Sequence, residues 1–485
     1  MHKGMKFQVV GYTLGIMITI VGLAEMVPAM IDWRLGHENA RIFFFNGILC
    51  LFFGGSLIIA NRSGVSEIRI REAFMLTVSS WFLVSIFCAL PLYMSDLDLS
   101  YVDAYFEAVS GITTTGASVL SGLNEVSNGI LFWRSMMQWV GGLGVIAFAI
   151  VLLPYLKVGG MQLFRSEASG HADKVMPRST EVFISMIQVY AGLTAICAFV
   201  YHLLGMGGFD AINHAMTTIS TGGYSTHDAS FAYYESRALQ YAAVFFMLLG
   251  ALPFVLYLRA VFQQRLIFFR DEQVRALLIG LSVMVVCMTL WLWMGTPYTL
   301  ETAFRNVLFS MVSIVTTTGY VTVDYTLWGG FAVLAFLLLT YIGASAGSTA
   351  GGAKVMRLVI AWRVVARQFK ILLYPSGVFV LNYQGRRLDN YTVLTVLGFL
   401  SLYVGANVMF TIALAMTGLD FETALSGAAS ALANVGPGVG AQIGPLGNYA
   451  ALPDAAKWIL SFGMILGRLE ILTVLVLFSA TYWRR

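Results

Sequence analysis

Ten apolar stretches set the first limit on how this chain can fold. A helix needs about 20 predominantly apolar residues to cross the hydrocarbon core of a bilayer. Of the 485 residues, 58% are hydrophobic and only 11% are charged, against roughly 25% charged residues in soluble domains. The sequence therefore predicts an integral membrane protein with ten spans. The predicted spans are residues 7–30, 42–60, 73–94, 136–156, 182–206, 238–258, 276–295, 328–343, 391–417 and 458–483.

The distribution of Lys and Arg predicts the orientation of these spans. The first stretch keeps Glu25 inside it and has no small-residue cleavage site, so we interpret it as a retained helix. With ten spans, both termini lie on one side of the membrane. If that side is the cytoplasm, 22 Lys and Arg lie inside, six lie outside, and Arg468 lies within a span. Because positive charge concentrates in cytoplasmic loops, we expect cytoplasmic termini and no nucleic-acid partner.

A short polar segment recurs four times between the spans. The four copies read ITTTGAS (112–118), TISTGGYS (218–225), VTTTGYVT (315–322) and LANVGPG (432–438). They align on Gly116, Gly222, Gly319 and Gly436. A small or hydroxyl residue stands six positions earlier in three copies (Ser110, Ser313 and Ser430), and Thr217 joins them only if the second copy shifts by one.

Each copy follows a short amphipathic stretch, and a second glycine recurs in the next span. That glycine is Gly141, Gly250, Gly343 or Gly467. A short helix and an extended segment cannot cross the bilayer, and irregular backbone is tolerated at membrane depth only where it is buried or lines water. Four such segments can converge on one axis, where carbonyl and threonine oxygens replace the hydration shell of a cation. Thr and Gly also mark ordinary helix ends, but four copies between flanking spans favour a pore.

The expected ion-binding residues are neutral. They are Thr114, Thr115, Gly116, Ser220, Thr221, Gly222, Thr317, Thr318, Gly319, Asn434, Val435 and Gly436.

These four units resemble the Trk/Ktr/HKT superfamily of potassium transporters, most closely its TrkH branch. The resemblance implies an all-α integral membrane protein with four M1–pore-helix–M2 repeats in a pseudo-fourfold arrangement, plus two extra N-terminal transmembrane helices. It implies a potassium-selective pore that prefers K⁺ and Rb⁺ to Na⁺, with K⁺ bound at the filter and no organic cofactor. It also implies a homodimer in the bacterial inner membrane, gated by a cytoplasmic nucleotide-binding subunit of the TrkA type.

Two departures weaken the expected selectivity relative to tetrameric potassium channels. The fourth segment lacks a threonine before Gly436, and the first has Ala117 where Tyr224 and Tyr320 follow in two others. We expect fewer ordered carbonyl rings and therefore weaker discrimination against sodium. The predicted units are 1–68 (two N-terminal helices), 69–172, 173–272, 273–388 and 389–485 (the four repeats).

Two features below the predicted filter suggest a gate. The run GASAGSTAGGAK (343–354) interrupts the eighth span, and its glycines disfavour a helix. We expect an intramembrane loop that blocks the path. Arg468 lies one residue after an aligned glycine, within a predicted span. Burying a charged side chain in the membrane costs free energy, and such residues usually have a function. Arg468 either faces the pore or pairs with an acid: Glu470 is two residues away and faces elsewhere on a helix, while Glu25 and Glu107 remain candidates. The expected gate residues are Gly343, Ser345, Gly347, Ser348, Thr349, Gly351, Gly352, Lys354 and Arg468.

Other classes of function have less support. The six histidines are scattered without a metalloprotease spacing, and no Walker or Rossmann glycine motif occurs, so we expect no enzyme activity. The four cysteines lie in apolar stretches without C-x-x-C spacing, which indicates packed, reduced thiols. A proton- or sodium-coupled cation symporter remains the alternative, because coupling leaves no mark in the sequence.

Overall fold

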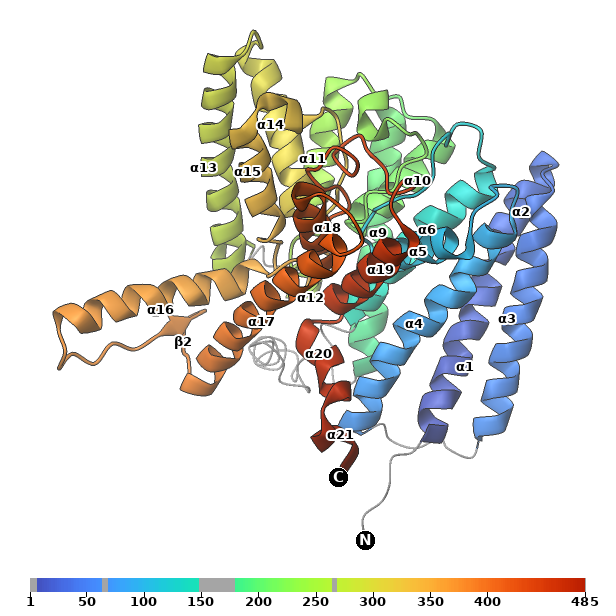
Figure 1. Cartoon of the computed structure of the whole chain (residues 1–485), viewed down its shortest axis with the longest axis horizontal. Helices are drawn as coiled ribbons and strands as arrows, with labels where there is room; N and C mark the ends of the chain where they lie inside the picture. Colours follow the sequence, from blue (N-terminus) through green and yellow to red (C-terminus); the bar gives the residue numbers. More distant parts are fainter. Residues whose placement is uncertain (1–6, 63–68, 148–178, 264–267, 485) are drawn as a thin grey trace.

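The computed structural model describes residues 7–62, 69–147, 179–263 and 268–484, and helices dominate this part of the chain (Figure 1). An N-terminal unit comes first. It consists of α1 (Phe7–Ala24), α2 (Met26–Leu35) and α3 (Asn39–Asn61). Gly15 and Gly54 let α1 and α3 approach closely, since a Cβ on either glycine would lie 2.8 Å from the carbonyl oxygen of the other. Small residues commonly allow such contacts between membrane helices.

Four repeats of similar design follow. The first contains α4 (Ile70–Met94), α5 (Tyr101–Ile112) and α6 (Asn128–Ala147). The second contains α9 (Ser179–Leu203), α10 (Gly208–Ile219), η3 (Ser230–Tyr233), α11 (Arg237–Gly250) and α12 (Phe254–Gln263). The third contains η4 (Phe268–Arg270), α13 (Glu272–Gly295), α14 (Leu300–Val315), η5 (Tyr325–Trp328), α15 (Gly330–Thr340), α16 (Val355–Leu373) and the hairpin β1 (Asn382–Tyr383) and β2 (Arg386–Arg387). The fourth contains α17 (Asn390–Ala415), α18 (Phe421–Ala433), α19 (Asp454–Arg468), α20 (Ile471–Leu475), η6 (Val476–Phe478) and α21 (Ala480–Arg484).

The short helices α5, α10, α14 and α18 lie between the long helices of each repeat. Side chains cap the N-termini of three of them: Ser100, Thr299 and Asp420 each accept a hydrogen bond from a backbone N–H three residues later. These bonds satisfy amides that have no partner within the helix. At α18, the hydrogen bond from the Thr423 amide holds the pKa of Asp420 below its ordinary value.

Six of the ten predicted spans are helices long and apolar enough to cross a membrane. These are Phe7–Leu35, Asn39–Asn61, Ile70–Met94, Glu181–Leu203, Glu272–Gly295 and Asn390–Ala415. The helix α6 covers the first part of span 136–156, and the rest of that span lies outside the described residues. Span 328–343 contains only the 11-residue α15, and residues 343–354 form no regular helix.

The stretches predicted as spans at 238–258 and 458–483 are each formed by two helices with a sharp bend between them, not by one continuous helix. The chain bends by 90° between α11 and α12, and by 106° between α19 and α20. Pro253 lies at the first break, where its ring cannot continue the hydrogen-bond ladder of α11. The second break occurs at Glu470, which has a positive φ of 62°. Both bends occur in the second long helix of a repeat, next to the short helices. In Figure 1, α16 and the hairpin project from the side of the molecule opposite α1 and α3.

Candidate functional site

The four short helices end in one backbone motif. The residues just after their last turns adopt the left-handed conformation, and a glycine with positive φ follows two positions later. The first set is Thr114, Thr221, Thr317 and Asn434, with φ of 54°, 52°, 57° and 55°. The second set is Gly116, Gly223, Gly319 and Gly436, with φ of 83°, 80°, 80° and 101°.

Matching hydrogen bonds accompany this geometry. In each repeat, the residue just before the positive-φ glycine donates a hydrogen bond from its backbone amide. The acceptor is the carbonyl of the residue five positions before that donor. The bonds are Thr115 to Ser110, Gly222 to Thr217, Thr318 to Ser313 and Val435 to Ser430, at 2.8–3.0 Å. This 6→1 bond around a left-handed residue is the Schellman ending of a helix.

The motif corrects the alignment of the second repeat. The sequence aligned Gly222 with the other filter glycines, but Gly223 has the equivalent positive φ. The second segment is therefore shifted by one: Thr221 and Gly222 match Thr114 and Thr115, and Ser220 matches Thr113. The shift also brings Thr217 into line with Ser110, Ser313 and Ser430.

The four glycines lie next to one another in a closed ring. A Cβ on Gly116 would lie 2.2 Å from the Gly222 carbonyl oxygen, and one on Gly223 would lie 1.8 Å from that of Thr318. The series continues from Gly319 to Val435 at 2.2 Å and closes from Gly436 to Thr115 at 2.7 Å. Each repeat thus contacts the next and the fourth contacts the first, so the four segments surround one axis. Only glycine fits at these four positions, because each faces a neighbour's backbone.

The ring is suited to a cation. The side chains at the left-handed positions and just after them are fully buried and uncharged. They include Thr114, Thr115, Thr221, Thr317, Thr318 and Asn434. All four short helices point their C-terminal ends at the ring, and this end of a helix carries a partial negative charge. Neutral oxygens and four helix dipoles can stabilise a dehydrated cation without binding it too tightly to release it.

Hydrogen bonds hold the filter segments to their surroundings. Ser430 Oγ donates to the Gly436 carbonyl at 2.8 Å, and Ser313 Oγ donates to that of Tyr320 at 2.7 Å. The Tyr224 hydroxyl donates to the Glu107 carbonyl at 2.8 Å, and that of Tyr320 donates to the His214 carbonyl at 3.0 Å. Each of these tyrosines therefore ties its segment to the short helix of the preceding repeat.

A buried ion pair behind the filter was missed by the sequence reasoning. Arg134 is one of the six Lys and Arg residues that the sequence places outside, between the spans, but it is 1% exposed. Its Nε lies 2.8 Å from Glu107 Oε1, its guanidinium lies 4.1 Å from the centre of the Tyr224 ring, and Nη1 donates to the Ser225 carbonyl. The two charges are 27 residues apart, so no short motif connects them. The pair joins the first repeat to the second filter segment.

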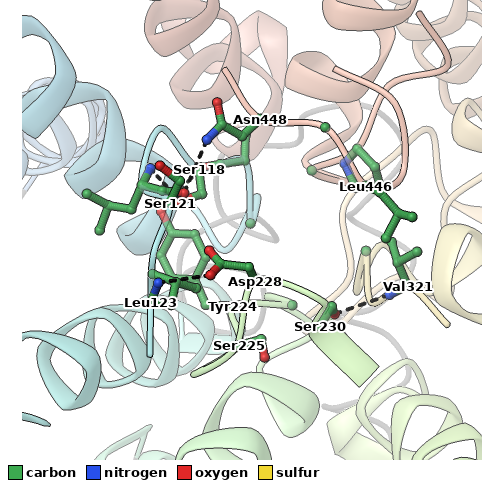
Figure 2. Close-up of a pocket in the computed structure, with 18 of the residues that line it drawn as sticks. Ser118, Ser121, Leu123, Tyr224, Ser225, Asp228, Ser230, Val321, Leu446 and Asn448 are labelled. Carbon is green, nitrogen blue, oxygen red and sulfur yellow. Dashed lines mark hydrogen bonds between the residues drawn. The ribbon is translucent and has the colours of Figure 1, made fainter. Parts of the chain in front are cut away.

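A cavity of about 410 Å³ lies on one side of the ring, and all four filter glycines line it (Figure 2). Hydrogen bonds between repeats join its walls. The Leu123 amide donates to Asp228 Oδ2 at 3.1 Å, and the Val321 amide donates to Ser230 Oγ at 3.3 Å. Asn448 Nδ2 donates to the Leu120 carbonyl at 3.3 Å. We call this cavity the vestibule.

Residues 343–354 pack against the other side of the filter. Thr349 Oγ1 donates to the carbonyls of Ile219 (3.1 Å) and Gly250 (2.9 Å). The Gly351 amide donates to Thr317 Oγ1 at 2.8 Å, and a Cβ on Gly351 would lie 2.1 Å from the Ala433 carbonyl oxygen. The loop thus contacts the helix ends of three repeats. The predicted gate residues in it are buried or nearly so, and Lys354 donates from Nζ to the Ala350 carbonyl.

Arg468 holds this loop. It is the last residue of α19 and is 5% exposed, and its Nη1 donates to the Thr349 carbonyl at 2.8 Å. No acid pairs with it in the part of the chain that the structure describes. The three candidate partners are all bound elsewhere: Glu470 pairs with Arg357 at 2.6 Å, Glu107 with Arg134, and Glu25 accepts from Asn46 Nδ2. Pairing of Arg468 with Glu25 or Glu107, which the sequence left open, is therefore wrong, and Glu470 is not its partner either.

Comparison with known proteins gives one consistent family. The family model TrkH, described as a cation transport protein, matches residues 39–485. The Trk system potassium uptake protein TrkI of Halomonas elongata is 46% identical over 432 residues, which cover 89% of this chain and 87% of that protein. The Trk system potassium uptake protein TrkH of Vibrio parahaemolyticus is 36% identical over 488 residues, covering 99% and 100%. The crystal structure of the potassium transporter TrkH from Vibrio parahaemolyticus matches with a TM-score of 0.91 at 34% identity, over 99% of this chain and 100% of that one.

Proposed function

This chain belongs to the TrkH family of cation transport proteins, and we propose that it is a potassium-selective pore that mediates potassium uptake. It is therefore a transporter and not an enzyme, and K⁺ is its substrate. The single observation that carries the proposal is the closed ring of glycine-to-carbonyl contacts. Four segments of one chain meet around an axis there, with neutral oxygens and helix C-termini directed at it.

Selectivity for K⁺ and Rb⁺ over Na⁺ follows from how the ring is built. The carbonyl oxygens of Thr115, Gly222, Thr318 and Val435 each lie against a glycine of the neighbouring segment. They replace the water that a cation loses on entry, and a Na⁺ ion needs closer oxygens than K⁺ to recover its larger hydration energy. Because each of these carbonyls abuts a glycine of its neighbour, the ring resists contraction around a smaller ion.

The loop 343–354 and Arg468 form the gate in this proposal. The loop lies across the inner side of the filter, where Thr349, Gly351 and the surrounding backbone fill the ion path. Arg468 places a positive charge beside it and bonds it in place. The loop and the charge that holds it therefore form one barrier to a cation leaving the filter until the loop moves.

The remaining assignments rest on the family and on charge. We expect a homodimer, gated by a cytoplasmic nucleotide-binding subunit of the TrkA type, in the bacterial inner membrane with both termini in the cytoplasm. The relatives are named as parts of a Trk system for potassium uptake, which supports a separate regulatory subunit. The basic loops support the orientation.

Uptake of ⁸⁶Rb⁺ into proteoliposomes that contain this protein alone tests the proposal, with K⁺, Na⁺ and Li⁺ as competitors. We expect K⁺ to compete strongly and Na⁺ weakly, without any imposed proton or sodium gradient. Uptake that appears only when such a gradient is applied would make the protein a coupled symporter, and the filter would then be a transport binding site. Equal competition by Na⁺ would contradict potassium selectivity.

A further inference from the structure

The second filter segment lacks a side chain where the other three have one. The residue before the filter glycine is Thr115, Thr318 or Val435 in three repeats, and Gly222 in the second. Gly222 does not have a positive φ, so its backbone conformation alone does not require glycine. Its lack of a side chain must therefore serve a neighbour.

That neighbour is Gln138 of α6, which belongs to the first repeat. A Cβ on Gly222 would lie 2.3 Å from both Cδ and Oε1 of Gln138. Gln138 Nε2 donates to the Gly222 carbonyl at 2.7 Å, and its Oε1 accepts from the Tyr224 amide at 3.0 Å. The side chain is fully buried. One amide thus binds the filter backbone on both sides of Gly223.

In the second and fourth repeats, the helix that corresponds to α6 has a different side chain at the position of Gln138. Gly141, Gly250 and Gly467 occupy matching positions. A Cβ on each would lie 1.9, 2.9 and 2.1 Å from a carbonyl oxygen of its own repeat, in each case that of the residue two positions before the left-handed residue. The residue three positions before each of them is Gln138, Met247 and Met464, respectively.

Methionine at this position accompanies a threonine in the next filter segment. Met247 precedes the segment with Thr318. Met464 lies beside Thr115, because Asn434 Nδ2 donates both to the Met464 carbonyl and to Thr115 Oγ1. Gln138 with Gly222 therefore takes the place of a methionine with a threonine. In the second filter segment, the glutamine adds two hydrogen bonds to the filter backbone.

We propose that Gln138 is a positioning residue of the second filter segment, and that its two hydrogen bonds help to set the preference of the pore for K⁺ over Na⁺. This inference rests on the proposed function. A carbonyl oxygen has two lone pairs, so the bond from Nε2 leaves the Gly222 oxygen able to face an ion while fixing its direction. A carbonyl that is fixed in this way cannot move inward to contact a smaller cation. Gln138 thus acts through Gly222 without touching the ion.

The test compares Gln138→Met with the double variant Gln138→Met/Gly222→Thr, which reproduces the pairing of Met247 and Thr318. For each purified, monodisperse protein, the concentrations of Na⁺ and K⁺ that halve ⁸⁶Rb⁺ uptake are measured. We expect Gln138→Met to lower the ratio of the Na⁺ concentration to the K⁺ concentration by about tenfold, which means weaker preference for K⁺. This change corresponds to about 1.4 kcal/mol. The double variant should recover most of the ratio. Gln240→Met is the matched control, because Gln240 bonds the Tyr234 carbonyl away from the filter.

Other outcomes would overturn the inference. A Gln138→Met protein with lower uptake but an unchanged Na⁺ to K⁺ ratio would show a merely structural role for Gln138. If the double variant is as unselective as Gln138→Met, then a methionine with a threonine cannot replace Gln138 with Gly222, and this part of the inference is wrong.

A second readout separates this inference from the proposed function. The thermal stability of each variant is measured in KCl and in NaCl, and a smaller excess of stability in KCl is expected for Gln138→Met. If the unaltered protein takes up no ⁸⁶Rb⁺, the proposed function fails, yet this comparison still decides whether Gln138 affects ion preference. An unchanged excess would contradict its role.

Discussion

Threonine at three of the four helix ends adopts a backbone conformation that β-branched residues rarely take. Thr114, Thr221 and Thr317 have φ near +55°, at a position where glycine or asparagine is usual. Such a residue costs about 1–3 kcal/mol and persists only where its surroundings enforce it. Thr221 and Thr317 use their hydroxyls to contact Thr349 and Gly351 of the loop. The strain is therefore located where the filter meets the gate.

Gly223 gives a prediction at the same scale, because it tests the register of the second segment. A Cβ at Gly223 would lie 1.8 Å from the Thr318 carbonyl oxygen, and its φ of 80° is itself unfavourable for alanine. We expect Gly223→Ala to abolish ⁸⁶Rb⁺ uptake by the purified protein in proteoliposomes, since the clash displaces a filter carbonyl.

Gly205 is the matched control for Gly223. It has a φ of 102°, but no heavy atom lies within 4 Å of its virtual Cβ. Gly205→Ala should therefore cost about 1–2 kcal/mol of stability through backbone strain and leave uptake intact. Normal uptake by Gly223→Ala would contradict the corrected register.

At the scale of elements, the loop 343–354, which we propose as the gate, connects two bent helices. The Phe254 amide, freed by the break before α12, donates to the Gly347 carbonyl at 2.9 Å, and the Ser345 amide donates to that of Ala251. On the opposite side, Arg468 ends α19 just before the second bend and bonds Thr349. The loop thus lies between the breaks of the second and fourth repeats and is joined to both by hydrogen bonds.

This arrangement predicts that Arg468 and the loop act as one barrier. Arg468→Ala should raise the rate of ⁸⁶Rb⁺ uptake by about tenfold, since a hydrogen bond to a charged group contributes about 1.5–3 kcal/mol to the closed state. Shortening the loop by removing residues 347–349 should raise the rate of ⁸⁶Rb⁺ uptake by a similar factor. Because the deletion removes Thr349, the partner of Arg468, adding Arg468→Ala should bring little further increase.

Two comparisons make this prediction decisive. Arg468→Lys keeps the charge and should give a rate between those of the unaltered protein and Arg468→Ala. Slower uptake by Arg468→Ala at normal expression would favour a structural role, and fully additive increases would mean two separate barriers.

The sequence predicted the family, the helical repeats and the recurring polar segment, because spans and repeats leave periodic marks. The TrkH resemblance is confirmed by the family match. The register of Gly222 and Gly223 was left open: Thr217 matched the serines of the other copies only after a shift by one, and the φ angles decide between the two adjacent glycines. Pro253 was a sign of the first bend that the predicted span 238–258 did not take into account, whereas Glu470 gave no comparable sign of the second. The partner of Arg468 was also out of reach, since it is a backbone carbonyl 119 residues away.

At the scale of the whole molecule, the four repeats of a pore built from one chain can carry different side chains and have different roles. The first repeat supplies Arg134 and Gln138, which support the neighbouring filter segment. The third supplies the loop, and the fourth supplies Arg468. A tetramer of identical subunits would have to repeat each of these features four times. The closed ring keeps its fourfold form because its contacts are made by backbone, while the side chains around it have diverged.

The last prediction concerns the orientation and electrostatics of the whole protein. Ser121 is exposed and lines the vestibule, whereas Asn382 is exposed on the hairpin after α16. Positive charge concentrates in loops that are expected on the cytoplasmic side, and the hairpin belongs to the most basic of them. In a Cys287→Ser background, a membrane-impermeant cationic thiol reagent added to intact cells should therefore label Ser121→Cys and not Asn382→Cys. Cys50, Cys88 and Cys197 are buried and should not react.

The charge of the reagent separates pore blockage from mere access. A cation attached at residue 121 raises the potential of the vestibule, which lowers the local concentration of K⁺ and slows its entry. Labelling should therefore reduce ⁸⁶Rb⁺ uptake by several-fold at low ionic strength and less in high salt, because added ions screen the attached charge. A neutral reagent of the same size should reduce uptake less at low salt. Equal inhibition by both reagents would indicate steric blockage, and labelling of Asn382→Cys from outside would reverse the proposed orientation.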